Sequence, residues 1–212
     1  MQNKLLTIAL PTRGRKDLLL KTLESIYQDD SDEFEVILKI DSDDIETIAF
    51  AESCKFKNFK FIISDRRNGW LNLNQYFNEL IEASNSEWIL GFNDDAIMET
   101  PNWFKQLKNQ LVGDRIYFLN TNGYRESFPV YKKYLKELWG TICPHNQIDS
   151  FLYDVYRSLG LVIYVNDVKI FHDIGLKDKI FDEKMVYCEH NTFLRDSCDI
   201  RPYVFHLYEK LK

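Results

Sequence analysis

The sequence predicts an α/β fold, with a mostly parallel central sheet flanked by helices and built as a single domain of residues 1–212. Two observations support this prediction. Short apolar runs alternate with segments whose apolar residues recur at helical spacing through the first half of the chain. The chain of 212 residues is 45% hydrophobic and has no repeat, linker or low-complexity segment, which favours one core of ordinary size.

Strands and helices follow each other in turn through this first half. A strand is predicted where an apolar run stops at a turn signal, as Lys4–Leu10 stops at Pro11. A helix is predicted from Asp17, its expected N-cap, to Ile26, where apolar residues recur every three or four positions. The further predicted strands are 34–40, 59–64 and 87–92, and the further helices are 45–53 and 71–83. Such alternation is typical of a parallel sheet with helices on both faces.

The alternation weakens after residue 100. A helix is predicted from Pro101 to about Leu111 and another over about 149–159. Strands are predicted over 115–120, 161–165 and 168–171. The segment Tyr124–Trp139 is aromatic and basic and has no predicted element, and the tail 177–212 is not assigned.

Charge and cysteine content limit the function classes. The net charge is −6, and ten acidic residues against one base, Lys39, fall within 29–52. This excludes a surface that attracts nucleic acid everywhere, but it leaves room for a local basic groove. Most of these acids, including those from Asp29 to Glu35, are expected to be solvated. The four cysteines form no C-x-x-C pair, and no apolar run reaches 18 residues, so a reduced, cytoplasmic setting is predicted.

Polar side chains follow each of the first four predicted strands. The carboxyl ends of parallel strands open onto one crevice, where ligands collect. Adjacent carboxylates at the end of a buried strand need neutralising, which favours a divalent metal at Asn93-Asp94-Asp95. The alternative is a turn in which the Asp side chains bond to nearby backbone. The strand-end residues are Thr12, Arg13, Asp41, Asp43, Arg66, Arg67, Asn93, Asp94 and Asp95.

Five segments in this order carry a resemblance to a known family: ALPTRGRKDLLLKTLESI, EVILKIDSDD, NGWLNLNQYFNELIEAS, EWILGFNDDAIM and TPNWFKQL. Together they resemble the GT-A nucleotide-sugar glycosyltransferases, most closely the inverting family 2 type. The resemblance covers about residues 4–112 and continues more loosely to about 172. One departure is Asn93, which stands at the first position of the D-x-D motif.

The resemblance implies a GT-A-like (Rossmann-like) fold, with a nucleotide-sugar-binding half at 1–112 and an acceptor-binding half at 113–212. It implies Asp95 and His172 as ligands of Mn²⁺ or Mg²⁺, and imidazole suits Mn²⁺ better. It also implies that Asp41 binds the donor base. For the two arginines after the first strand, an exposed loop is the alternative, and for Asp43 and Asp44 a helix cap. The implied donor-binding residues are Pro11, Thr12, Arg13, Asp41, Asp43, Arg67, Gly69, Asn74, Asn93 and Asp94.

The resemblance places the catalytic base of an inverting reaction at Asp149, which begins a predicted helix. The alternatives are that Asp149 only caps this helix, or that Asp154 is the base. For the acceptor, Trp139 could stack on a sugar face. Lys132 and Lys133 could contact acceptor phosphates.

The predicted reaction is metal-dependent transfer of a sugar, with inversion, from a nucleotide-diphosphate donor such as a UDP-sugar to an acceptor hydroxyl. The acceptor could be a glycan, a lipid-linked sugar or a hydroxymethylated base of viral DNA, which would place the enzyme in the host cytoplasm. A sugar nucleotidyltransferase would need a Gly-rich first loop, and this loop has only Gly14. A domain that binds a nucleotide sugar or a partner without turnover is a further alternative, which Asn93 supports.

Overall fold

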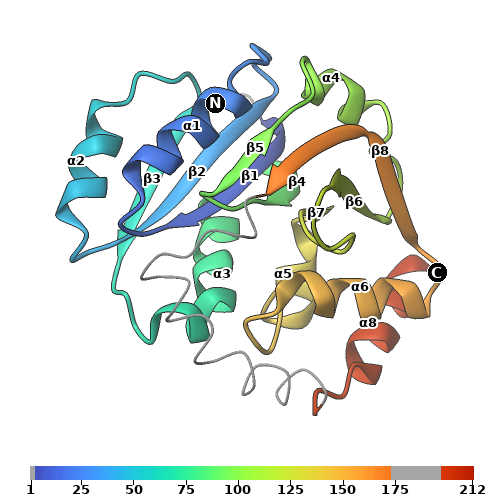
Figure 1. Cartoon of the computed structure of the whole chain (residues 1–212). Coiled ribbons are helices and arrows are strands. Elements are labelled where there is room, and N and C mark those ends of the chain that lie inside the picture. Colours follow the sequence, from blue (N-terminus) through green and yellow to red (C-terminus); the bar gives the residue numbers. More distant parts are fainter. Residues whose placement is uncertain (1–2, 173–196) are drawn as a thin grey trace.

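The computed structural model describes residues 3–172 and 197–212, and its centre is an eight-stranded sheet (Figure 1). The strands are β1 (Lys4–Thr12), β2 (Phe34–Asp41), β3 (Phe59–Ser64), β4 (Ser86–Gly91), β5 (Ala96–Met98), β6 (Ile116–Thr121), β7 (Pro129–Lys132) and β8 (Val162–His172). The helices are α1 (Lys16–Ile26), α2 (Ile45–Ser53), η1 (Gly69–Asn72), α3 (Leu73–Ala83), α4 (Trp103–Lys108), α5 (Tyr134–Trp139), α6 (Ile148–Ser158) and α8 (Arg201–Leu211).

The strand order is β3-β2-β1-β4-β7-β6-β8-β5. The first four strands in this order are parallel, as are β6 and β8, so the sheet is mostly parallel. The short strands β7 and β5 run antiparallel to their neighbours. The predicted α/β fold class is therefore confirmed. In Figure 1, the long curved β8 reaches across to β5, which directly follows the Asn93–Asp95 turn.

Helices cover both faces of the sheet, with one hydrophobic core on each face. The first core lies between the sheet and α1, α2 and α4, and the second between the sheet and α3, α5, α6 and α8 (Figure 1). Alternate residues of each strand point to opposite faces. In β2, Val36, Leu38 and Ile40 therefore join the first core, and Ile37 joins the second. None of the described helices has the length and apolar character that crossing a membrane requires.

Several predicted boundaries differ from the structure. Pro11 does not end the first strand, because β1 continues to Thr12 and Pro11 pairs in register with Lys39. Asp17 is not the N-cap of α1, since that position is Arg15. The two short strands predicted over 161–171 form the single strand β8, whose pairing with β6 shifts at one irregularity. The elements β5, β7, α5 and α8 were not predicted.

The acidic segment is less solvated than the sequence suggests. Asp29 is buried, and its carboxylate accepts hydrogen bonds from the backbone N–H of Ser31 and Phe104 at 3.0 Å each. Glu35 is also buried and pairs with Lys60 at 3.0 Å. The expectation of a wholly solvated Asp29–Glu35 loop is therefore wrong, because these two acids tie the loop and β2 to neighbouring elements.

Trp103 is expected to be a large contributor to stability. Its side chain is fully buried against Phe34, and its indole N–H donates to the carbonyl of Ile26 at 2.9 Å. Trp103→Ala should lower the free energy of unfolding by about 3–5 kcal/mol, because it leaves a cavity and removes this hydrogen bond. Urea denaturation measures the change. The matched control is Tyr124→Ala at an exposed position, which should change it by less than about 0.5 kcal/mol.

Candidate active site at the carboxyl ends of the strands

The turn between β4 and β5 brings together the residues predicted to bind a metal. Antiparallel pairing of β5 with β8 sets Ala96 opposite His172, at the end of β8. His172 Nε2 consequently lies 3.2 Å from Asp95 Oδ1 and 3.3 Å from Asn93 Nδ2. The fold thus joins a carboxylate and an imidazole that are far apart in the sequence.

The first loop, between β1 and α1, neutralises the two carboxylates of this turn. Arg15 Nη1 lies 3.0 Å from Asp94 Oδ1 and 3.1 Å from Asp95 Oδ2. Thr12 Oγ1 donates to Asp94 Oδ2 at 2.8 Å. Burial raises the pKa of Asp94 to about 6, although Arg15 and Thr12 oppose the rise. These partners come from the end of β1 and from the first loop, and they supply the positive charge and the hydrogen bond that the two carboxylates need.

Asp95 and His172 fit a divalent ion in their chemistry. Carboxylate oxygen and neutral imidazole nitrogen together suit Mn²⁺ better than Mg²⁺. Within residues 3–172 and 197–212, no three His, Cys, Asp or Glu side chains form a cluster that could hold a metal. Two protein ligands suffice where substrate phosphates and water complete the coordination, as in many nucleotide-dependent sites. The donor set therefore suits a metal that arrives with a diphosphate.

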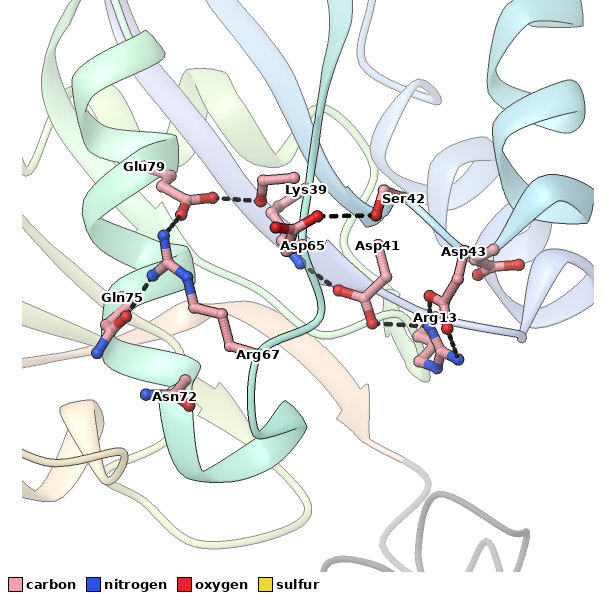
Figure 2. Close-up of polar contacts among 12 residues, drawn as sticks. Arg13, Lys39, Asp41, Ser42, Asp43, Asp65, Arg67, Asn72, Gln75 and Glu79 are labelled. Atoms are coloured by element: carbon pink, nitrogen blue, oxygen red, sulfur yellow. Dashed lines mark hydrogen bonds and ion pairs between the residues drawn. The ribbon is translucent and has the colours of Figure 1, made fainter.

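A second polar cluster lies at the carboxyl end of β2 (Figure 2). Arg13 from the first loop contacts Asp41 Oδ2 at 3.0 Å and is also paired with both oxygens of Asp43. The two carboxylates raise the pKa of Arg13 still further above neutrality. The other oxygen of Asp41 accepts from the ammonium group of Lys39. Asp44 is the N-cap of α2, as the capping alternative predicts, and accepts from Thr47 N at 3.3 Å.

The connection from β3 to α3 and the first turn of α3 hold three predicted donor-binding residues. Arg67 turns toward α3 and pairs with Gln75 and Glu79 (Figure 2). Gly69 has a φ of 56°, a left-handed conformation that glycine adopts without strain. Asn74 donates to the carbonyl of Cys143 at 3.0 Å. Arg67 and Asn74 therefore have protein partners in this structure.

The loop before α6 brings Asp149 to the same end of the sheet. This loop is bound to the segment that follows β3, both through Asn74 and through Asn146, which donates to the carbonyl of Trp70 at 3.2 Å. The N-cap of α6 is Gln147, so Asp149 lies in the first turn rather than at the cap. Asp149 Oδ1 accepts from Ser150 N at 2.9 Å.

The structure separates the predicted acceptor lysines from this site. β7 is antiparallel to β4, and Lys132 pairs with Trp88 near the start of β4. Lys132 therefore lies at the amino ends of the parallel strands, opposite the candidate site. Lys132 pairs with Glu87, and Lys133 donates to the carbonyl of Ser84. Both ammonium groups thus have partners within the protein, and both lysines lie away from the carboxyl ends of the parallel strands.

Trp139 packs inside the second half of the chain. Its ring lies edge-on to Phe151 at 5.8 Å and to Tyr203 at 5.6 Å between ring centroids. Trp139 thus packs α5 against α6 and α8, at the margin of the second core. A role in stacking on an acceptor sugar remains a prediction that these contacts do not support.

The sequence alone assigned no role to two cations of the site. Arg15 follows Arg13 by two residues in the same loop, and no local pattern distinguishes the two. Lys39 interrupts an apolar strand, two residues before Asp41 at its end. A lysine in a strand otherwise buried on both faces was the available signal, because such a charge needs a partner.

Solved structures with the same fold include two glycosyltransferases. TarS from S. aureus, residues 1–349, matches at 14% identity over 79% of this chain and 60% of that chain, with a TM-score of 0.62. Other TarS structures contain UDP or UDP-GlcNAc. The mannosyltransferase PcManGT from Pyrobaculum calidifontis, in complex with GDP-Man and Mn²⁺, matches at 15% identity over 97% of this chain and 69% of that chain, with a TM-score of 0.71.

A synthase of 4-diphosphocytidyl-2C-methyl-D-erythritol from Anaerococcus prevotii shares the fold less closely. It matches at 16% identity over 91% of this chain and 96% of that chain, with a TM-score of 0.53. No curated protein sequence matches the chain. The chain spans about 60% of the length of the TarS structures. The sequence model described as "Glycosyl transferase family 2" matches residues 7–175, which is most of the chain, so this protein belongs to glycosyl transferase family 2.

Proposed function

We propose that this chain is a metal-dependent, inverting glycosyltransferase that moves a sugar from a nucleotide-diphosphate donor to an acceptor hydroxyl. The observation that carries the proposal is the pairing of Asp95 with His172 at 3.2 Å, at the strand ends where ligands bind in α/β sheets. Family membership supports the reaction class. Asn93 lies beside this pair, with its amide nitrogen 3.3 Å from His172 Nε2.

The donor is proposed to lie along the carboxyl ends of β1, β2 and β4. Asp41 would accept a hydrogen bond from the base, and Thr12 and Asp94 would face the ribose and sugar. A carboxylate is a stronger acceptor for a base N–H than a neutral hydroxyl is. Complexes of the structural neighbours with UDP, UDP-GlcNAc and GDP-Man support a donor of this class. We propose a UDP-sugar.

The proposed chemistry has two parts. A divalent ion held by Asp95 and His172 would supply positive charge against the leaving diphosphate. Asp149 would take the proton from the acceptor hydroxyl as its oxygen attacks the anomeric carbon. The bond between that carbon and the diphosphate oxygen breaks, and the diphosphate leaves with the electron pair. One displacement without a covalent intermediate inverts the anomeric centre.

The acceptor is proposed to be a glycan or a lipid-linked sugar. The alternative of a DNA acceptor rests on Arg125, Lys132, Lys133 and Lys136, which are interleaved with aromatic residues. Arg125 lies over the ring of Tyr164, 4.1 Å from its centroid. Lys132 is paired with Glu87, and Lys136 with Glu82, on the far edge of the sheet. These contacts remove the specific support for nucleic acid, so we do not propose it.

A thermal-shift series with UDP-, GDP-, CDP- and ADP-sugars, each with and without Mn²⁺, tests the donor and the metal together. A donor at 100 times its Kd should add about 2.7 kcal/mol of stability. For a chain of this size, that corresponds to a rise in Tm of about 5–10 °C. We expect the rise for one nucleotide class, and only with the metal. No shift with any sugar nucleotide would contradict the proposal.

Release of free nucleoside diphosphate distinguishes an enzyme from a domain that only binds. Many transferases slowly transfer their sugar to water, so the donor that gives the thermal shift should be hydrolysed in the presence of Mn²⁺ and not in EDTA. Binding without any release, with water or with acceptor glycans, would favour the non-catalytic alternative.

A further inference from the structure

Lys39 is a fully buried lysine close to the proposed donor base. It lies on β2 two residues before Asp41, so the two side chains point to the same face of the sheet. That face is covered by α3, and the ammonium nitrogen of Lys39 lies 3.6 Å from the ring centroid of Tyr76 on this helix. Lys39 is only 1% exposed, and its ammonium group pairs with Asp41 Oδ1 (Figure 2).

Stability does not explain a lysine at this position. Removing an ammonium group from water is costly, and its attraction to a buried carboxylate only partly offsets the cost. Replacement of such a pair by apolar residues of similar volume is often neutral or stabilising. Ile37, the preceding residue of β2 on the same face as Lys39, is fully buried in the second core, so apolar side chains fit this face. The position of Lys39 beside Asp41 therefore indicates a role at the carboxyl end of β2.

Lys39 is the more rigid of the two cations that hold Asp41. Arg13 holds Asp41 Oδ2, but its side chain is 29% exposed and is shared with Asp43. Lys39 is enclosed by the sheet and by Tyr76, which leaves its ammonium group little freedom. Each oxygen of a carboxylate has two acceptor positions, so these contacts leave a second position on each oxygen. Lys39 thus holds Oδ1 of Asp41 from inside the protein, while Oδ2 is held by the more exposed Arg13.

We propose that Lys39 is a positioning residue that orients Asp41 to accept a hydrogen bond from a ring N–H of the donor base, and so makes the site select for such bases. Uracil and guanine carry a hydrogen on the ring nitrogen at their pairing edge. Cytosine and adenine carry a lone pair there, which the carboxylate repels. This inference rests on the proposed function, and it adds the residue that makes Asp41 selective.

Calorimetric titration with UDP and CDP, and with GDP and ADP, each in the presence of Mn²⁺, tests the inference. Within each pair the two bases have the same ring system, but the ring nitrogen at the pairing edge carries a hydrogen in one base and a lone pair in the other. In the wild-type protein, the N–H base should bind about 10- to 100-fold more tightly than its counterpart in at least one pair. Lys39→Met keeps the aliphatic stem and removes the charge. It should reduce that ratio to less than about threefold, with binding of inorganic pyrophosphate unchanged.

Lys60→Met is the matched control. Lys60 lies on the neighbouring strand β3 and pairs with buried Glu35 at 3.0 Å, but at the opposite end of the sheet. The Lys60→Met variant should keep the wild-type ratio of nucleotide affinities. Tyr76→Leu removes the ring beside the ammonium group while leaving Lys39 in place, and should lower the ratio by a smaller factor. This variant serves as the test if Lys39→Met does not fold.

Three results would overturn the inference. The first is a wild-type protein that binds CDP as tightly as UDP and ADP as tightly as GDP. The second is an unchanged ratio of nucleotide affinities in Lys39→Met, or in Tyr76→Leu if Lys39→Met does not fold. The third is an equal loss of selectivity in Lys60→Met. All three leave the proposed function intact, whereas a wild-type protein that binds none of the four nucleotides contradicts the proposed function itself.

Discussion

Replacing Asp95 with alanine is expected to lower kcat/KM for sugar transfer in the presence of Mn²⁺ by about 10³-fold. Asp95 contacts both His172, at 3.2 Å, and Arg15, at 3.1 Å. Its loss would remove a carboxylate from the metal position and leave the diphosphate less well neutralised as it departs. Initial rates at a fixed acceptor concentration, measured over a range of donor concentrations, give the change.

Direct metal binding separates this effect from a loss of fold. The signal of free Mn²⁺ in electron paramagnetic resonance should show tight binding by the wild-type protein with UDP and weak binding by Asp95→Ala. Asp167→Ala is the control, because Asp167 is an exposed acid on the same strand as His172. It should bind Mn²⁺ and turn over normally. Full donor turnover by Asp95→Ala with Mn²⁺ would rule out the proposed role.

The fold of residues 1–112 could be predicted from sequence because its signals are local. Each of its parallel strands is an apolar run that stops at a polar turn. Each connection brings the chain back to the end of the sheet where the strands begin, so all of these turns lie at the other end. The boundaries of α2 and β3 agree with their predicted ranges residue for residue. The position of Asp41 at the end of β2 follows from the same pattern.

The fold of residues 113–212 could not be predicted as well, because its arrangement depends on pairing between distant strands. β7 has only four residues and begins with Pro129, so the sequence carries little sign of a strand. Its direction decides where Lys132 lies, and only the antiparallel pairing with β4 places that lysine at the far edge. In contrast, the closeness of His172 to Asp95 follows from the family resemblance and not from any local signal.

Asp149→Asn is expected to lower kcat by about 10²- to 10⁴-fold, with donor binding changed by less than about twofold. An amide cannot accept the proton of the attacking hydroxyl, but it keeps the size of the carboxylate. The loop before α6 is fixed by Asn74 and Asn146, independently of the Asp149 side chain, so the variant should fold. Single-turnover kinetics and calorimetry with donor give the two quantities separately.

Asp154→Asn is the matched comparison, because Asp154 is the other acid of α6 and the alternative candidate for the base. If Asp149 is the base, only its variant should lose the rise of kcat/KM with pH that marks deprotonation of a general base. A larger loss in Asp154→Asn would move the assignment to Asp154. Equal small losses in both variants would show that no acid of α6 takes the proton. The base would then have to come from another part of the chain, because an inverting displacement still requires a group that deprotonates the acceptor.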